Sequence, residues 1–416
     1  MAGSEILFLA HRVPFPPDRG DKIRSHHILK ALAAIAPVHV ATFGETDADM
    51  ACERDLAEIA ASHVLVRRTK PLWRAGLEAL TRGEPISLAA FRDPAIARFV
   101  SRKLEQRRIG AIYVFSGQMG QYLPAAPAVR AIVDLVDVDS AKFETYGSAG
   151  NSPRRWIDRR EGRLLRREEA RLTGLADYTL LVSDAEAALL RSRLQEDGWP
   201  FDGDRVFALG NGVDTAKFDP AGIEVPWDFS QAGPHFVMTG QMDYTPNIAA
   251  ARRFVDGILP ALRARYSEAR FHVVGRNPPE SLRRMSGRDG VYVWGEVAEV
   301  QPFLAGADAV VAPLDLARGV QNKVLEGMAM GRPLVLSSGA ATGIGGRDGT
   351  HYRVADSDED FIAALEGLIA DRKLGETMGQ AARRFVVETC SWPAKLAGLP
   401  DMIGIGPAAA CDADAA

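Results

Sequence analysis

The stretch of residues 310–333 constrains the fold more than any other part of the chain. An apolar run ending at Leu314 predicts a buried parallel strand, residues 315–321 a polar loop, and residues 322–330 a helix that Gly331 closes. A strand that leads through a loop into a helix presents free backbone N–H groups and the positive end of the helix dipole. The stretch therefore predicts a junction suited to phosphate or pyrophosphate.

Two charged side chains lie in the first turns of that helix. Lys323 can meet phosphate, and Glu326 can accept hydrogen bonds from a pair of sugar or ribose hydroxyls. The same pattern also fits an ordinary strand-loop-helix unit whose Lys and Glu face solvent. The residues alone leave both interpretations open.

The length and composition predict two globular domains. With 416 residues, the chain is too long for one core of typical size and suits two domains of about 200 residues. Its hydrophobic content of 47% and charged content of 25% are ordinary for a soluble protein. Residues 1–217 hold 31 Lys and Arg against 29 Asp and Glu, and the remainder 19 against 25. A nearly neutral first half argues against a nucleic-acid-binding surface.

The expected lack of a targeting segment and the pattern of cysteines indicate a cytoplasmic protein. No apolar run is long enough to span a bilayer, and the first residues lack the basic and apolar regions of a signal peptide. Cys52, Cys390 and Cys411 are isolated and far apart, so we expect free thiols and neither a disulfide framework nor a zinc site.

The chain opens with the predicted strand 5–10, a loop containing three prolines, and a helix from Lys22 to about Ala36. The dinucleotide signature G-x-G-x-x-G is missing from this loop. We treat Arg19, Gly20 and Lys22 as candidate cleft residues, because a glycine permits close approach of a ligand. The alternative is a solvated basic loop stiffened by its prolines.

A cluster of acids follows the apolar run that begins at Ala131. If the strand persists to Asp139, alternation places Asp137 and Asp139 on one side and Asp134 on the other. Such groups at the carboxyl end of a parallel strand point into a ligand crevice.

Two segments are strongly basic. The helix predicted over Arg154–Arg171 contains eight arginines together with an apolar side, and residues 67–74 are basic around Trp73. A basic amphipathic helix can lie on an anionic membrane, and both segments can equally be solvated basic faces.

The second landmark is residues 206–214, a strand ending in Asn211-Gly212, where both residues tolerate positive φ and predict a tight turn. Residues 216–235 are rich in Pro and Gly and predict a linker. The next strand leads to Gly240 and Gln241 before a helix, which repeats the strand-loop-helix geometry of a phosphate cradle.

Several of these stretches together resemble the retaining GT-B glycosyltransferases of family 4, and most closely the sugar transferases associated with exopolysaccharide and PEP-CTERM systems. The resemblance spans about residues 5–395 and is most specific in Asn211–Asp214 and Leu325–Pro333. It implies an α/β protein with two Rossmann-like domains whose parallel sheets face each other across a cleft. The implied parts are an acceptor-side domain 1–215, a linker 216–235, a donor domain 236–388, a helix 389–403 that crosses back, and a disordered tail 404–416.

The resemblance also assigns roles to residues. Glu326 matches the glutamate that binds the nucleotide ribose, whereas Arg318 stands where the family has a glutamate for the donor sugar. The family's basic residues for the pyrophosphate are absent near Gln241, so Lys323, Arg318 and Arg276 are the candidates. Val297 would bind the base through its main chain. The remaining donor-side candidates are Asn322, Gly319 and Gly240, and Asp137, then Asp139, is the candidate near the anomeric carbon.

The function implied is transfer of a sugar, with retention, from a nucleotide diphosphate such as a UDP- or GDP-sugar to a carbohydrate or lipid-linked acceptor. No cofactor, metal or nucleic acid is implied, and Arg154–Arg171 is the candidate membrane contact. The alternatives are a nucleotide-sugar 2-epimerase and a catalytically silent scaffold in a polysaccharide complex. Asp137-Val138-Asp139 also spells the D-x-D of metal-dependent GT-A transferases, which the rest of the chain does not resemble.

Overall fold

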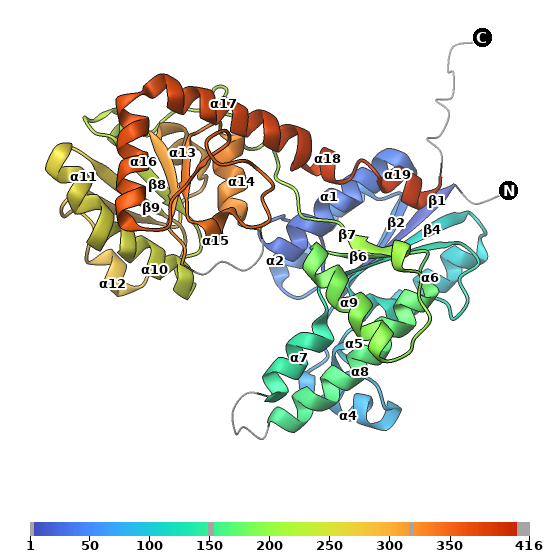
Figure 1. The fold of residues 1–416 in the computed structure, drawn as a ribbon. Helices are drawn as coiled ribbons and strands as arrows, with labels where there is room; N and C mark the ends of the chain where they lie inside the picture. Colours follow the sequence, from blue (N-terminus) through green and yellow to red (C-terminus); the bar gives the residue numbers. More distant parts are fainter. Residues whose placement is uncertain (1–3, 149–153, 316–319, 406–416) are drawn as a thin grey trace, which may run out of the picture. The chain divides into compact units, whose positions relative to one another are not determined.

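A computed structural model describes residues 4–148, 154–315 and 320–405 (Figure 1). The chain divides into two compact units, one of Met1–Asn211 with Lys395–Ala416 and one of Gly212–Ala394. Each unit contains a parallel sheet and a hydrophobic core of its own. The predicted α/β class with two Rossmann-like halves is confirmed.

The sheet of the first unit has seven strands in the order β3-β2-β1-β4-β5-β6-β7. Strands β1 and β2 are buried along almost their whole length, which is why they read as continuous apolar runs. The strands are β1 (Glu5–Ala10), β2 (Val38–Gly44), β3 (Ser62–Arg67), β4 (Ile109–Phe115), β5 (Arg130–Val136), β6 (Tyr178–Leu181) and β7 (Val206–Ala208).

The sheet of the second unit has six strands in the order β10-β9-β8-β11-β12-β13. The strands are β8 (His235–Thr239), β9 (Arg270–Val274), β10 (Val291–Gly295), β11 (Ala309–Ala312), β12 (Leu334–Leu336) and β13 (Arg353–Val354).

Helices surround both sheets. Those of the first unit are α1 (Gly20–Ile35), α2 (Asp47–Ala51), α3 (Glu53–Ile59), α4 (Leu72–Arg82), α5 (Ile86–Ala90), α6 (Pro94–Glu105), η1 (Gly117–Tyr122), α7 (Asp139–Ser148), α8 (Arg154–Leu175), α9 (Asp184–Glu196), η2 (Gly203–Arg205) and α19 (Leu399–Ile403). Within this unit, α4, α7 and the start of α8 extend together beyond the sheet (Figure 1).

The second unit also has helices around its sheet. The last of them, α18 (Trp392–Lys395), ends where the chain returns to the first unit. The others are η3 (Trp227–Ser230), α10 (Thr245–Arg253), η4 (Phe254–Ile258), α11 (Leu259–Arg265), α12 (Glu280–Arg283), α13 (Gln301–Gly306), α14 (Asn322–Ala329), α15 (Ser338–Ala341), α16 (Asp358–Ala370) and α17 (Arg372–Thr389). Helix α14 buries Val324, Leu325 and Met328, and Gly331 ends it with a φ of 64°. The predicted closure by Gly331 is confirmed.

Two local predictions are wrong. Strand β5 does not persist to Asp139, because Val136 adopts a φ of 70° that ends the strand, and α7 begins at Asp139. The Asn211-Gly212 pair does not use positive φ. Glycine is required at 212 for space, since a Cβ there would lie 2.7 Å from the backbone nitrogen of Trp392.

The segment predicted as a linker packs on the second unit. Phe229 of η3 stacks on His272 of β9 with ring centroids 4.2 Å apart. At the other end of the chain, α19 belongs to the first unit, where Arg130 donates hydrogen bonds to the carbonyls of Asp401 and Met402. From residue 406 on, the predicted tail, Cys411 included, lies outside the described residues. Cys52 and Cys390 are free thiols, as expected.

Candidate functional site

The carboxyl ends of β8 and β11 mark the point where strand order reverses in the second unit. The chain runs from β8 to β9 and β10 on one side and then places β11 on the other side of β8. In open parallel sheets, ligands bind where neighbouring strands leave in opposite directions, because the loops there diverge and leave a crevice. The loop after β8 and the helix after β11 are therefore the elements that can hold a ligand.

Two glycines make room at this edge. Gly240 after β8 has a φ of 149°, and Gly275 after β9 has a φ of 155°. A Cβ on Gly275 would lie 1.7 Å from the carbonyl oxygen of Gly240, so the two loops approach as backbone only. A Cβ on Gly240 would lie 3.0 Å from Nδ2 of Asn247 and 3.3 Å from Nζ of Lys323. Because Gly240 has no side chain, Asn247 and Lys323 can both lie against this loop.

Asn247 holds the side chain of Lys323 in place. The Nζ of Lys323 donates a short hydrogen bond to Oδ1 of Asn247, and Nδ2 of Asn247 donates to the carbonyl of Gln241 at 2.8 Å. Asn247 is buried in the first turns of α10, so the ammonium on α14 is fixed over the loop after β8. Two residues that are 76 positions apart in sequence thus place a cation beside the backbone of Gly240 and Gln241.

Burial shifts the pKa of both charged residues of α14 toward neutrality. It lowers the pKa of Lys323 to about 8, against the opposing charge of Glu326. It raises the pKa of Glu326 to about 7, although the charges of Lys323 and Lys217 act in the other direction. Groups whose charges are poorly solvated are suited to a ligand that supplies phosphate to the one and hydroxyls to the other.

The other donor-side candidates have differing surroundings. Asn322 opens α14 and is exposed, as are Gln241 and Arg276, whose carbonyl accepts a 2.9 Å hydrogen bond from the backbone of Met242. Val297 is partly buried against the core of the second unit. Arg318 and Gly319 lie outside the described residues.

The first unit has its own reversal of strand order, between β1 and β4. Ala10 pairs with both Thr42 and Phe115, so β1 and β4 end level with each other, and β2 continues past them to Gly44. The loop after β1 and the turns after β4 and β5 form this edge. Ser116 and Val136, which follow β4 and close β5, have φ values of 77° and 70°. Positive φ at non-glycine residues is a strain that clusters at functional sites.

Asp137 and Asp139 share one cation at this edge. Nζ of Lys142 lies 2.7 Å from Asp137 and 3.2 Å from Asp139. Burial would lower the pKa of Lys142, but the hydrogen bond to Asp137 and the charge of Asp139 raise it overall. The two carboxylates are brought together by the turn into α7, and strand alternation plays no part.

Asp134 faces away from this edge into the core. Nε and Nη2 of Arg24 donate to its two oxygens at 2.9 and 3.1 Å, and the Tyr113 hydroxyl donates at 3.0 Å. Arg24 also donates to the carbonyl of Leu209 at 2.6 Å and to Asn211 at 3.1 Å. Asp134 is therefore a structural residue that ties α1 to the sheet.

The three candidates after β1 differ in their availability. Lys22 is 4% exposed, and its Nζ donates to Asp49 at 2.6 Å and to the carbonyl of Phe15 at 3.0 Å. These contacts make it a support of the loop. Arg19 is exposed, with Nε 3.2 Å from Asp21. Beyond the chain neighbours and helix backbone of Gly20, no atom of the described residues lies within 4 Å of where its Cβ would be.

His11 is a candidate that the sequence patterns did not single out. It directly follows β1, its ring stacks on Phe115 with centroids 5.8 Å apart, and its Nε2 lies 3.5 Å from Asp21. Burial opposes the charge of Asp21, yet hydrogen bonds from His11 and Arg12 hold its pKa well below the usual range. Its position as the first residue past the opening strand was the only available signal. Asn247 was missed in the same way, as an ordinary residue near a helix start.

Across the described ranges, no group of three or more His, Cys, Asp or Glu side chains is arranged to hold a metal ion. Within those same ranges, no helix is long and apolar enough to cross a membrane.

The part of the chain that matches a known protein family lies in the second unit. Residues 233–371 match the family described as "Glycosyl transferases group 1". This match covers both glycine loops, Asn247 and helix α14.

Solved structures extend the likeness to the whole chain. HepE of Anabaena, in complex with UDP and glucose, has a TM-score of 0.60 at 13% identity and covers 96% of this chain and 99% of its own. The chain has the GT-B fold. A glycosyltransferase of Rickettsia africae has a TM-score of 0.60 at 12% identity, covering 97% of this chain and 98% of its own.

The likeness also includes WaaG, a glycosyltransferase involved in lipopolysaccharide biosynthesis. It has a TM-score of 0.60 at 16% identity and covers 96% of this chain and 100% of its own. No curated protein matches the sequence.

Proposed function

We propose that the protein is a retaining glycosyltransferase that moves a sugar from a nucleotide diphosphate donor to a carbohydrate or lipid-linked acceptor, without a metal. The observation that carries the proposal is the cation of Lys323, fixed by Asn247 beside the backbone of Gly240 at the strand-order reversal of the second unit. Because this arrangement lies inside the segment that matches the group 1 glycosyltransferases, a nucleotide-sugar donor is the ligand it suits best.

In this proposal, the diphosphate of the donor binds at the start of α14. The helix dipole and free N–H groups attract it, and Lys323 neutralises its charge, with Arg276 as a second cation. Burial lowers the pKa of Lys323 to about 8. A bound anion would favour the protonated lysine, so the donor should bind more weakly as the pH rises above 8. Stabilising the departing diphosphate is the main contribution to rate.

Glu326 accepts hydrogen bonds from the ribose hydroxyls of the donor. Burial raises the pKa of Glu326, and hydrogen bonds from two hydroxyls would favour its charged form. Asn322, Gln241 and the main chain of Val297 complete the proposed donor site. Arg318 stays a candidate cation for the diphosphate and Gly319 a donor-side candidate, both outside the described residues.

The acceptor side is assigned to the first unit. Asp137, with Asp139 beside it, orients the substrate or stabilises positive charge that develops at the anomeric carbon, while the leaving phosphate helps to deprotonate the acceptor. Arg19 and Gly20 line the same edge. HepE and WaaG, which bind UDP and act in lipopolysaccharide biosynthesis respectively, favour a UDP-sugar and a role in making cell-surface polysaccharide. We accordingly place the protein in the cytoplasm, where nucleotide sugars are made.

A thermal-shift panel of UDP-, GDP-, ADP- and CDP-sugars against wild type and Glu326→Ala tests the donor assignment. One donor class should raise the melting temperature of the wild type, because it binds only the folded protein, and the shift should be lost in the variant. No shift with any donor would contradict the proposal and favour a silent scaffold.

Product analysis with the donor so identified tests the reaction. Donor and acceptor together should give a glycoside of retained configuration, whereas free UDP and an epimerised sugar from donor alone would indicate an epimerase. An Asp137→Asn variant should bind donor normally and turn over slowly, and unchanged turnover would remove Asp137 from the mechanism.

A further inference from the structure

The turn from β5 into α7 is held along its backbone by carboxylates. Every second amide from residue 136 to residue 140 donates a hydrogen bond to an acidic side chain. The pairs are Val136 with Asp134 of β5 at 3.1 Å, Val138 with Glu186 of α9 at 2.7 Å and Ser140 with Glu169 of α8 at 2.9 Å. Asp137 and Asp139, the candidate acids of the first unit, lie between these anchored positions. Hydrogen bonds to charged acceptors are the strong ones, so the backbone is fixed on both sides of each acid.

The turn needs this support, because Val136 has a φ of 70°. A β-branched residue rarely adopts such a conformation, and the strain persists only where the surrounding structure over-determines it. The side chains of Val138 and Ser140 are buried, whereas those of Asp137 and Asp139 are partly exposed. The buried residues therefore anchor the turn, and the two acids project from it.

Glu169 makes two contacts with the start of α7. Besides the amide of Ser140, it accepts a 2.5 Å hydrogen bond from the Ser140 hydroxyl. Arg193 of α9 donates to the same hydroxyl at 3.2 Å. Glu169 is buried, so its removal would leave the amide and the hydroxyl of Ser140 in the interior without this acceptor. The loss of both bonds would release the end of the turn that follows Asp139.

Helices α7 and α8 run side by side, which brings Glu169 to this turn (Figure 1). Gly162 of α8 allows the close approach, since a Cβ there would lie 3.2 Å from the carbonyl oxygen of Ser140 and 3.2 Å from the backbone nitrogen of Glu144. Seven residues return to the same face of a helix after about two turns. Glu169 therefore lies on the face of α8 that contacts α7 at Gly162.

The surroundings of Glu169 also suit a neutral side chain. Burial raises the pKa of Glu169 to about 7, and the charge of Asp139 acts in the same direction, against the hydrogen bonds from Ser140. The amide of a glutamine has the same shape, and it can accept from the Ser140 backbone and donate to the Ser140 hydroxyl. A Glu169→Gln substitution therefore separates the shape of this contact from its charge.

We propose that Glu169 is a positioning residue for glycosyl transfer, which sets the turn 136–140 and through it the orientation of the Asp137 carboxylate. The inference rests on the proposed function, because Glu169 acts through Asp137. A misplacement of about 1 Å can lower a rate about a hundredfold. Loss of Glu169 should therefore slow turnover, and it should leave donor binding unchanged, since the proposed donor residues belong to the second unit.

Glu161 offers a matched control on the same helix. It is buried, lies eight residues before Glu169, and accepts from the amides of Ile86 and Ser87 at 2.8 and 2.9 Å. These amides begin α5, so Glu161 makes the same kind of contact with a different helix. No residue of α5 has been assigned to the reaction.

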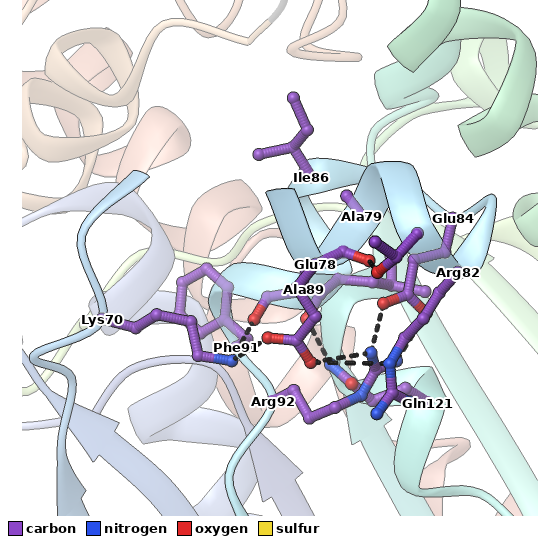
Figure 2. A network of polar contacts seen from close by, with 12 residues as sticks. Lys70, Glu78, Ala79, Arg82, Glu84, Ile86, Ala89, Phe91, Arg92 and Gln121 are labelled. Carbon is purple, nitrogen blue, oxygen red and sulfur yellow. Dashed lines mark hydrogen bonds and ion pairs between the residues drawn. The ribbon is translucent and has the colours of Figure 1, made fainter. Parts of the chain in front are cut away.

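Helix α5 keeps further contacts when Glu161 is changed. The carbonyl of Ala89 accepts a 2.8 Å hydrogen bond from Lys70 (Figure 2). Lys70 also pairs with Glu78 of α4 at 2.8 Å, and Arg92 pairs with the same carboxylate at 3.3 Å (Figure 2). This network holds the end of α5, so we expect the Glu161→Ala variant to remain folded.

Hydrogen exchange of the full chain without any ligand is the first test. Glu169→Ala should speed the exchange of the amides of residues 138–142 by about tenfold, because the turn opens locally more often. Glu169→Gln and Glu161→Ala should leave the exchange of these amides near that of the wild type. The melting temperature should fall to a similar extent in Glu169→Ala and Glu161→Ala.

Steady-state kinetics is the second test. The probe is the release of UDP from UDP-glucose, UDP-N-acetylglucosamine or UDP-glucuronate, with water as the acceptor and with the donor that the wild type hydrolyses fastest. Glu169→Ala should lower kcat about tenfold and change the donor KM by less than about twofold. Glu169→Gln and Glu161→Ala should keep kcat within about twofold of the wild type. In an Asp137→Asn background, Glu169→Ala should lower kcat by less than about twofold, because residues that act through each other are not additive.

Unchanged exchange in Glu169→Ala, or an unchanged kcat in this variant of an active enzyme, would each overturn the proposal. So would a loss of kcat in Glu169→Gln or Glu161→Ala as large as that in Glu169→Ala, or a loss that persists at full size in the Asp137→Asn background. A wild type that releases UDP from none of the three donors would count against the proposed function. The exchange of residues 138–142 would then decide by itself whether Glu169 sets the turn.

Discussion

Glu326 is a carboxyl group in surroundings that disfavour its charge. Burial raises its pKa to about 7, and on the same helix burial lowers the pKa of Lys323 to about 8. Both shifted pKa values therefore lie close to neutral pH. A donor that offers hydroxyls to Glu326 and phosphate to Lys323 would stabilise the charged form of both.

We predict that Glu326→Gln stabilises the free protein in a pH-dependent way. The folded state holds the proton more tightly than the unfolded state, so the cost of the charge is absent at low pH, grows above the ordinary pKa and is complete above 7. Gln removes that cost and should raise the free energy of unfolding by about 2 to 3 kcal/mol near pH 8, and by only a few tenths near pH 4.5.

Urea unfolding at the two pH values measures this difference, with Glu280→Gln as the control because that side chain is 67% exposed. A stability change of equal size at both pH values would show that Glu326 acts through packing and that its charge is not disfavoured. The same variant should weaken donor binding, since a donating NH2 group replaces one of the two accepting oxygens of the carboxylate.

At the scale of elements, a buried ion pair holds α1 against its sheet. Arg24 of α1 is 1% exposed and contacts Asp134 of β5 as well as the carbonyl of Leu209 after β7. One guanidinium thus joins a helix to two strands that are far apart in sequence. The loop after β1, with Arg19 and Gly20, enters this helix, so its position depends on the same pair.

We predict that Asp134→Asn lowers the free energy of unfolding by about 3 kcal/mol or more, because it leaves the Arg24 charge buried without its counter-charge. Asp137→Asn is the matched control. Its carboxylate pairs with Lys142 at a partly exposed position, where an ion pair contributes less than about 1 kcal/mol. Chemical denaturation of both variants gives the comparison, and equal losses would contradict the structural role assigned to Asp134.

At the scale of the whole molecule, the two units have separate cores and separate candidate sites. The core of the second unit includes Val324 and Leu325 beside the donor residues, and the core of the first unit includes Leu135 and Val138 beside the acids. A ligand that binds only one unit should therefore protect mainly that unit from local opening.

Hydrogen exchange with and without UDP tests this division. We expect protection to rise in peptides that cover Gly240–Asn247 and Asn322–Glu326, and to change little in peptides that cover β5 and the start of α7. The Glu326→Ala variant supplies the control for binding. Protection confined to the first unit would place the nucleotide site there and contradict the assignment.

The sequence by itself determined the alternation of strands and helices, the junction at 310–333 and the end of α14 at Gly331. These features depend on local rules, because apolar periodicity sets an element and a glycine with positive φ ends a helix. The short turn after β5 escaped those rules. Val136 adopts a conformation that β-branched residues rarely take, and no local pattern announced it.

Only the tertiary structure decided which charges meet. Strand alternation separated Asp134 from Asp137 and Asp139, but it did not reveal that Asp134 pairs with Arg24 from 110 residues away while the other two share Lys142. Lys323 likewise finds Asn247, 76 residues earlier. The face of α4 that carries its leucines also turned outward, because its alanines fit the small cluster beneath it. Which charges pair, and which face of a helix turns outward, depend on the packing of segments that are distant in sequence. Local propensity does not encode that packing.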